Sequence, residues 1–194
     1  EMCIRDRGNG AARDNTTGQY NTAVGNYCLA SNQGGSWNVA IGSGVMDTGT
    51  AINETTAIGY RAMHGVVSGV RNTAVGHIAL GIIRDKTDST AVGYYAGTYA
   101  SGSYNTFVGS KAGMGGSNNV APYDTGTYNT VVGAGALQNF SSASYNVAIG
   151  YEAMNDTKGA SNNVAIGYQA FDVMTTGTGV AIGYAAGGSV TTGD

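Results

Sequence analysis

The side chains able to do chemistry are few and scattered along this chain. It contains two histidines, His64 and His77, and two cysteines, Cys3 and Cys28. Neither histidine has a cysteine or carboxylate partner at the spacing typical of a zinc site. The glycine-rich segments lack the Gly-Lys-Ser/Thr ending of a phosphate-binding loop, and the Gly-Gly-x-Gly-x-Asp repeat of calcium-binding solenoids is absent. We therefore expect no enzymatic activity, no cofactor and no metal site.

The composition also excludes several classes of partner. Only 11% of the 194 residues are charged and the net charge is −3, which provides no electrostatic basis for binding nucleic acid or an anionic membrane. No stretch is long and apolar enough to be inserted into a bilayer. The 33 glycines and single proline instead suit a chain with a turn in every repeat.

One motif, Asn-(Thr/Val)-Ala-(Val/Ile)-Gly, recurs along the whole chain. Successive motif glycines are 17, 17, 17, 17, 16, 24, 17, 17 and 16 residues apart. A fixed period indicates one structural unit per repeat, stacked on its neighbours. The motif glycines are Gly25, Gly42, Gly59, Gly76, Gly93, Gly109, Gly133, Gly150, Gly167 and Gly183.

Positions counted from this glycine predict the local structure. Position −1 is Val or Ile and position −3 is Thr or Val in all ten copies, while position −2 is Ala in eight. Alternating β-branched residues predict a strand that the glycine ends. Alanine at +3 in eight copies and a large apolar residue at +4 in seven predict a second, shorter strand. Asn at −4 in seven copies predicts a ladder of stacked amides.

Two strands and two turns per repeat predict an all-β β-solenoid of about ten coils of 17 residues. With coils about 4.8 Å apart, the rod would be roughly 50 Å long. We expect the Val/Ile face to fill the interior, and the Ala face to be covered by two further copies around a common axis. The opposite assignment of the two faces stays open. Thr at −3 shares its face with Val or Ile at −1, so we expect it to belong to a buried strand rather than to an ice-binding array.

The ends predict a fragment of a longer array. Residues 2–6, Met-Cys-Ile-Arg-Asp, resemble a translated sequencing adapter, so we expect residues 1–7 to be an adapter-derived scar. Residues 8–194 then form a single array that is truncated at both ends. Its one irregularity, the 24-residue interval, predicts an insertion loop near residues 115–128.

The motif resembles two known families over residues 8–194. It is similar to the head repeats of trimeric autotransporter adhesins (YadA-like), with the consensus Asn-Ser-Val-Ala-Ile-Gly-x-x-Ser. In the form Asn-Thr-Ala-Val-Gly-Tyr-x-Ala-Leu it also resembles repeats of phage tail fibres, which an endosialidase-type chaperone domain often follows. The adhesin resemblance implies trimers of left-handed parallel β-rolls. The period of 17 and Ala in place of the trailing Ser favour the tail-fibre form.

We therefore expect a structural or adhesive segment of a homotrimeric surface fibre, located outside the cell on a virion tail or a bacterial surface. A phage tail fibre involved in host attachment ranks first and a bacterial trimeric adhesin head second. An ice-binding solenoid is a distant alternative. The expected partners are further copies of the chain, and a host-cell glycan or protein bound by this segment or by an absent tip domain.

Two sets of residues are candidates for contacts. The insertion predicts a contact loop, against the alternative of tolerated decoration, at Asn118, Asn119, Pro122, Tyr123 and Asp124. Position +1 predicts either an exposed aromatic row or a ladder packed along the coil edge, at Tyr60, Tyr94, Tyr151, Tyr168 and Tyr184. The same two interpretations apply to position −5, with Tyr20, Trp37, Tyr104, Tyr128 and Tyr145.

Overall fold

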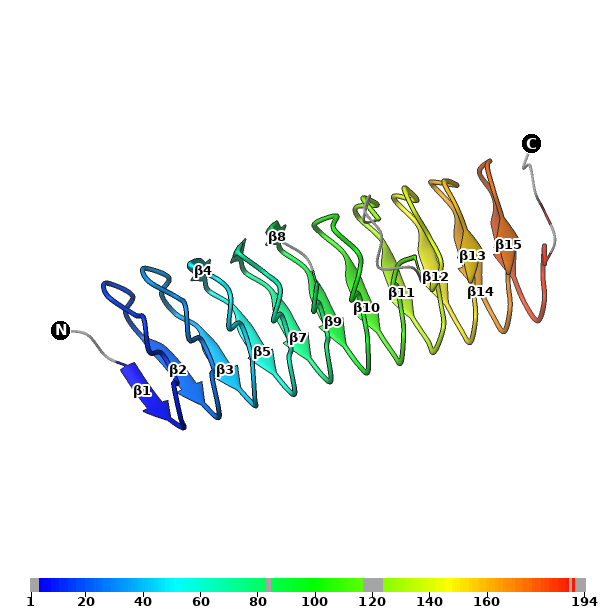
Figure 1. Cartoon of the computed structure of the whole chain (residues 1–194). Helices are drawn as coiled ribbons and strands as arrows, with labels where there is room; N and C mark the ends of the chain where they lie inside the picture. Colours follow the sequence, from blue (N-terminus) through cyan, green and yellow to red (C-terminus); the bar gives the residue numbers. More distant parts are fainter. Residues whose placement is uncertain (1–3, 83–84, 117–123, 189, 191–194) are drawn as a thin grey trace.

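The computed structural model describes residues 4–82, 85–116, 124–188 and 190. Its parallel strands stack as a β-solenoid of about ten coils, as the period predicts, and the first and last described coils lie at opposite ends of the rod (Figure 1). The ten motif strands and a first strand at residues 4–7 form a single eleven-stranded sheet, which we call the main sheet.

The strands of the main sheet follow the order of the coils. They are β1 (Ile4–Arg7), β2 (Asn21–Val24), β3 (Val39–Ile41), β5 (Thr56–Ile58), β7 (Thr73–Val75), β9 (Thr90–Val92), β10 (Thr106–Val108), β11 (Thr130–Val132), β12 (Val147–Ile149), β14 (Val164–Ile166) and β16 (Val180–Ile182). Equivalent motif positions pair with one another, and the 24-residue interval keeps this register because Thr106 pairs with Thr130. The first strand includes residues 4–7, and the adapter origin of that segment remains a prediction about its source.

Shorter strands close some of the coils. One sheet contains β4 (Ala51–Asn53), β6 (Ser68–Val70) and β8 (Asp85–Thr87), and another contains β13 (Asp156–Thr157) and β15 (Val173–Met174). The prediction of a second strand at +3 and +4 is wrong, because these positions lie in turns. Leu29 and Met63, both at +4, have φ of 52°, a left-handed backbone that an extended strand excludes. Their N–H groups still bond to the next coil, at 2.8 and 3.0 Å.

The motif glycine is required by the stacking of the coils. Gly150 has φ of 133°, which side-chain-bearing residues rarely adopt. A Cβ atom at this position would lie 2.3 Å from the carbonyl oxygen of Gly167 in the next coil. The other motif glycines have φ between 126° and 140°, so the same turn recurs in every coil.

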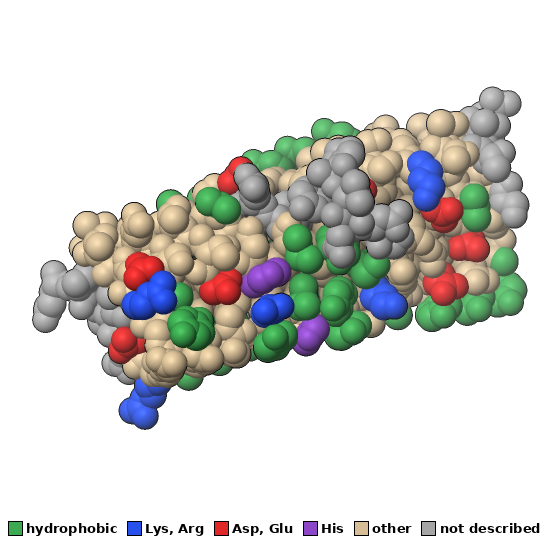
Figure 2. Space-filling view, viewed as in Figure 1, with side chains coloured by type: hydrophobic (Ala, Val, Ile, Leu, Met, Phe, Trp, Pro, Cys, Tyr) green, Lys and Arg blue, Asp and Glu red, His purple; other side chains and the backbone are tan. Residues whose placement is uncertain are grey.

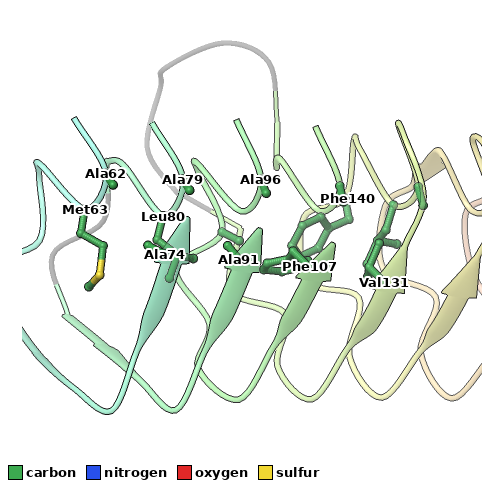
Figure 3. Close-up of a cluster of buried hydrophobic side chains, with 14 of the residues drawn as sticks. Ala62, Met63, Ala74, Ala79, Leu80, Ala91, Ala96, Phe107, Val131 and Phe140 are labelled. Carbon is green, nitrogen blue, oxygen red and sulfur yellow. The ribbon is translucent and has the colours of Figure 1, made fainter. Parts of the chain in front are cut away.

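The interior reverses the expected assignment of the two faces. Alanines at −2 and +3 and the large residue at +4 fill the solenoid, whereas Val and Ile at −1 lie on the outside. Figure 3 shows Ala74 and Ala91 from the strands opposite Ala79 and Ala96 from the turns, with Leu80 between them. The turn folds the +4 side chain over the strand, which leaves room only for small residues at the other two positions.

Phe107 demonstrates how little space the interior offers. It replaces alanine at −2 and is fully buried. In its own coil and the preceding one the +4 residue is glycine, at Gly113 and Gly97, and a Cβ at either would lie 2.0 or 2.7 Å from the phenyl ring. A phenyl ring at −2 thus excludes a large side chain at +4.

The predicted asparagine ladder is confirmed. The side chains at −4 are buried, and Asn38 donates from its side-chain amide to Oδ1 of Asn21 and to the carbonyl of Ile52, at 3.0 and 2.6 Å. Asn146 and Asn163 make the same link at 3.1 Å. The ladder provides hydrogen bonds to most of the buried amides, the exception being Oδ1 of Asn163, and fixes the register of successive coils.

Candidate functional site: the outer face of the main sheet

The side chains at −3 and −1 form one continuous surface, which we call the outer face. Seven of its ten Val and Ile side chains at −1 are between 36% and 38% exposed, and those of Ile58 and Val75 are less exposed. The seven are Val24, Ile41, Val92, Val108, Val132, Ile149 and Ile166. Thr and Val at −3 are partly to fully exposed beside them. Monomeric proteins rarely leave an apolar surface of this length uncovered.

Charged groups do not break up this pattern. In Figure 2 the Lys, Arg, Asp and Glu side chains are scattered singly or in small groups, whereas hydrophobic side chains gather near the middle and along the lower edge of the rod. Of the ion pairs that the described residues form, the bidentate contact of Arg71 with Asp88 lies at the −5 edge of the outer face, with N–O distances of 2.6 and 2.8 Å. The outer face is thus an apolar strip with a mixed edge.

Aromatic rings line both edges of this strip. In the +1 column, Tyr168 stacks between Tyr151 and Tyr184, with ring centroids 5.3 and 5.1 Å apart. His77 occupies the same column between Tyr60 and Tyr94, at 5.3 Å from each ring. The five predicted tyrosines are 42% to 81% exposed, so they form a packed ladder whose ring edges face solvent.

The −5 column forms an equivalent ladder at the other edge. Tyr128 stacks between Tyr104 and Tyr145, with centroids 4.9 and 5.0 Å apart, and Tyr20 stacks on Trp37 at 5.7 Å. These five side chains are also exposed. All five have a positive φ, which places the start of each motif strand at a sharp corner.

The predicted contact loop is described only at its last residue. Asn118, Asn119, Pro122 and Tyr123 lie outside the described residues. Asp124 is buried, and its carbonyl accepts hydrogen bonds from the backbone N–H and the hydroxyl of Ser101. Burial raises the pKa of its carboxyl to about 6. It borders a pocket of about 340 Å³ together with Gly116, Asn139, Phe140, Ser141, Asp156 and Lys158.

A smaller aromatic pocket was missed by the sequence analysis. It has a volume of about 160 Å³ and is lined by Tyr94, Tyr95, Tyr99, Lys111 and Met114. The ring of Tyr95 lies 4.5 Å from that of Tyr94. Three tyrosines in one coil were a visible signal, but Tyr95 and Tyr99 occupy positions that vary from repeat to repeat.

A lysine that the repeat pattern does not predict lies inside the solenoid. Lys86 on β8 is fully buried, and its Nζ atom has no hydrogen-bond partner among the described residues. The nearest aromatic contact is the ring of Phe107, whose centroid is 5.8 Å away. Burial lowers the pKa of this amine from 10.5 to about 7.

The remaining reactive side chains have structural surroundings. Cys28 is buried at a +3 position, where burial raises the pKa of its thiol. Nδ1 of His64 lies 2.6 Å from the carbonyl oxygen of Gly81. Within the described residues, no three His, Cys, Asp or Glu side chains come close enough together to hold a metal ion. Those residues also include no helix with the length and apolarity needed to cross a membrane.

Comparison with known proteins adds no relative. No protein-family model matches the chain, and no curated protein and no solved structure matches it either. The functional argument therefore depends on the outer face and on the resemblance of the repeat.

Proposed function

We propose that this chain is a shaft or head segment of a homotrimeric surface fibre, most simply a phage tail fibre that takes part in host attachment. Each copy would be a left-handed parallel β-roll, as the resemblance to YadA-like heads implies. Three rods would lie parallel, with their outer faces turned toward a shared axis. The segment would hold a receptor-binding tip at a distance and would itself offer lateral contacts to a host-cell glycan or protein.

The single observation that supports this proposal is the half-exposed row of Val and Ile along the outer face. Covering those side chains would gain about 25 cal/mol for each Å² of apolar surface removed from water. The row has the same period as the solenoid, so a partner that covers it along its length needs the same period. Further copies of this chain meet that requirement. The number three comes from the resemblance.

Sedimentation equilibrium tests the assembly. We expect the purified chain to have three times its monomer mass of 19.6 kDa at high concentration. Ile149→Lys would place a charge in the proposed interface and should give monomers that retain the β-sheet circular dichroism spectrum. Gln33→Lys, at an exposed site in the polar turn, is the matched control and should assemble normally. A wild-type chain that stays monomeric at all concentrations would contradict the proposal.

The biological owner requires a separate test, because both resemblances predict the same rod. The complete gene sequence distinguishes them. A downstream endosialidase-type chaperone beside virion genes would support the tail fibre. A downstream coiled coil with a short membrane β-barrel, together with an upstream signal peptide, would support the bacterial adhesin instead.

An ice-binding solenoid remains the distant alternative to a fibre, favoured by one specific observation. Thr22, Thr56, Thr73, Thr90, Thr106 and Thr130 lie on the outer face rather than in the interior, so the expectation that they are buried is wrong. Four copies carry Val at this position, and aromatic ladders border the strip, which makes the threonine array irregular. An assay of ice recrystallisation decides: inhibition by the chain at micromolar concentration would favour this candidate over the fibre.

A further inference from the structure

The two aromatic columns at the edges of the outer face are complementary, coil by coil. A ring occupies −5 in five of the ten coils and +1 in six, and only one coil has a ring at both. Because five and six rings are distributed over ten coils, one shared coil is the smallest overlap that the two columns can have. The pairs, −5 residue first, are Tyr20 with Asn26, Trp37 with Ser43, Glu54 with Tyr60, Arg71 with His77, Asp88 with Tyr94, Tyr104 with Ser110, Tyr128 with Ala134, Tyr145 with Tyr151, Asn162 with Tyr168, and Thr178 with Tyr184.

Packing within one chain does not account for this complementarity. The two positions are six residues apart, on either side of a motif strand, so their side chains begin at most about 20 Å apart at roughly 3.3 Å per residue. Each column stacks internally, as Tyr104 does on Tyr128. Among the described residues, no ring contact joins the −5 column to the +1 column.

We propose that the −5 column of one copy packs against the +1 column of the next copy, with equal coils at equal height. This inference rests on the proposed assembly of parallel copies and specifies its register. When copies are related by rotation about the rod axis, the edge where one motif strand begins meets the edge where the neighbouring strand ends. Nine of the ten junctions then receive one ring and one smaller or polar side chain, which fills the space without overcrowding it, and the junction of Tyr145 with Tyr151 receives two rings.

The chemistry of the central coils fits this junction. There the −5 column carries Glu54, Arg71 and Asp88, opposite rings at Tyr60 and Tyr94 and the imidazole of His77. A phenol hydroxyl can donate to a carboxylate, and a guanidinium stacks on a planar ring. Arg71 is already held by Asp88 in its own column, so its planar group is oriented before a partner arrives.

The register can be tested by exchanging a ring and a small side chain between the two columns of one coil. The two exchanged residues do not touch within one chain, so any compensation between them must arise between copies. The variants are Tyr104→Ser, Ser110→Tyr and the double variant that exchanges them. The matched control combines Tyr104→Ser with Asn26→Tyr, which adds the ring to a coil whose −5 position already holds Tyr20. Both added rings would occupy exposed positions, so the isolated chain should accept them. Sedimentation equilibrium measures the concentration at which half of the chains are assembled.

We expect each single variant to raise that concentration about tenfold, which corresponds to about 1.4 kcal/mol. The same-coil double variant should assemble at a concentration within about threefold of the wild-type value. The mismatched double variant should need a concentration about a hundredfold higher than the wild type. If the chain assembles but the same-coil double is no better than the mismatched one, the register is overturned and the proposed fibre survives. If the wild type never assembles, the proposed function itself fails.

Discussion

The two faces of the main sheet use the same strands but distribute their side chains in opposite ways. The inner face carries mostly alanine and is fully buried, whereas the outer face carries Val and Ile that stay half-buried. A larger apolar side chain gains more from burial than alanine does. A sheet that had only itself to stabilise would therefore place its larger residues inside.

The difference teaches that the interior is limited by the thickness of the coil. A phenyl ring at −2 leaves no room for a leucine at +4, and the glycines at +4 beside Phe107 mark that limit. The Val and Ile of the outer face are only partly covered by their own chain. Their further burial requires another molecule, which is the physical basis of the proposed assembly.

The largest expected effect comes from emptying the inner face. Phe107→Ala should lower the free energy of unfolding by about 3–5 kcal/mol, because it leaves a cavity in an interior closed by the backbone. Adding Gly113→Leu should recover much of that loss, since Leu at +4 adopts the same positive φ in other coils. Urea denaturation of the single and double variants measures both effects. Additive losses would show that the two positions do not share one space.

Overfilling the inner face should have a smaller effect. Ala165→Leu places a large side chain where the structure leaves no space, and should cost about 1–3 kcal/mol of stability. Gln169→Leu, two positions past the motif glycine of the same coil, replaces a partly buried side chain and should cost less. Thermal unfolding of the two variants compares them. Equal tolerance would mean that the alanine face is not closely packed.

A pH-dependent effect is expected from the charge on the inner side of β8. Lys86 has a pKa of about 7 in the folded chain and 10.5 as its ordinary value, so between these pH values the unfolded chain binds more protons. Stability should therefore rise with pH in this window, by up to about 1.4 kcal/mol per pH unit, and is lowest below pH 7. Lys86→Met should remove that rise and stabilise the chain at pH 7.

Urea denaturation at pH 7, 8 and 9 measures this dependence. Lys111→Met, at an exposed position, is the control and should keep the pH dependence of the wild type. If the free energy of unfolding of Lys86→Met changed with pH as steeply as that of the wild type, the Lys86 amine would have to be hydrated in the folded chain.

The sequence predicted the features that local geometry repeats in every coil. The period, the parallel register, the turn at the motif glycine and the asparagine ladder each follow from one position considered across all copies. Strand alternation shows that two faces differ, but it does not say which one the turn covers, so the assignment of the faces was wrong. The second strand was misplaced because Leu29 and Met63 adopt a left-handed backbone that residue propensities do not predict.

Single departures from the repeat were the other source of error. Lys86, Tyr95 and Tyr99 each occur once at positions where other copies differ, so a consensus gave no reason to weigh them. The placement of Lys86 inside the solenoid depends on how its coil closes, and that is tertiary information. The complementarity of the two aromatic columns was present in the sequence, but it gained meaning only when the structure placed them at opposite edges of one exposed face.

The most direct test of the central claim is to observe whether the outer face touches another copy. In a sample that mixes methyl-labelled with unlabelled chains, isotope-filtered nuclear Overhauser spectra detect contacts between copies alone. The account predicts intermolecular contacts for the methyl groups of Ile149 and Ile166, and none for the interior methyl groups of Leu137 and Met154. Outer-face methyl groups that contact only solvent in an assembled sample would contradict it.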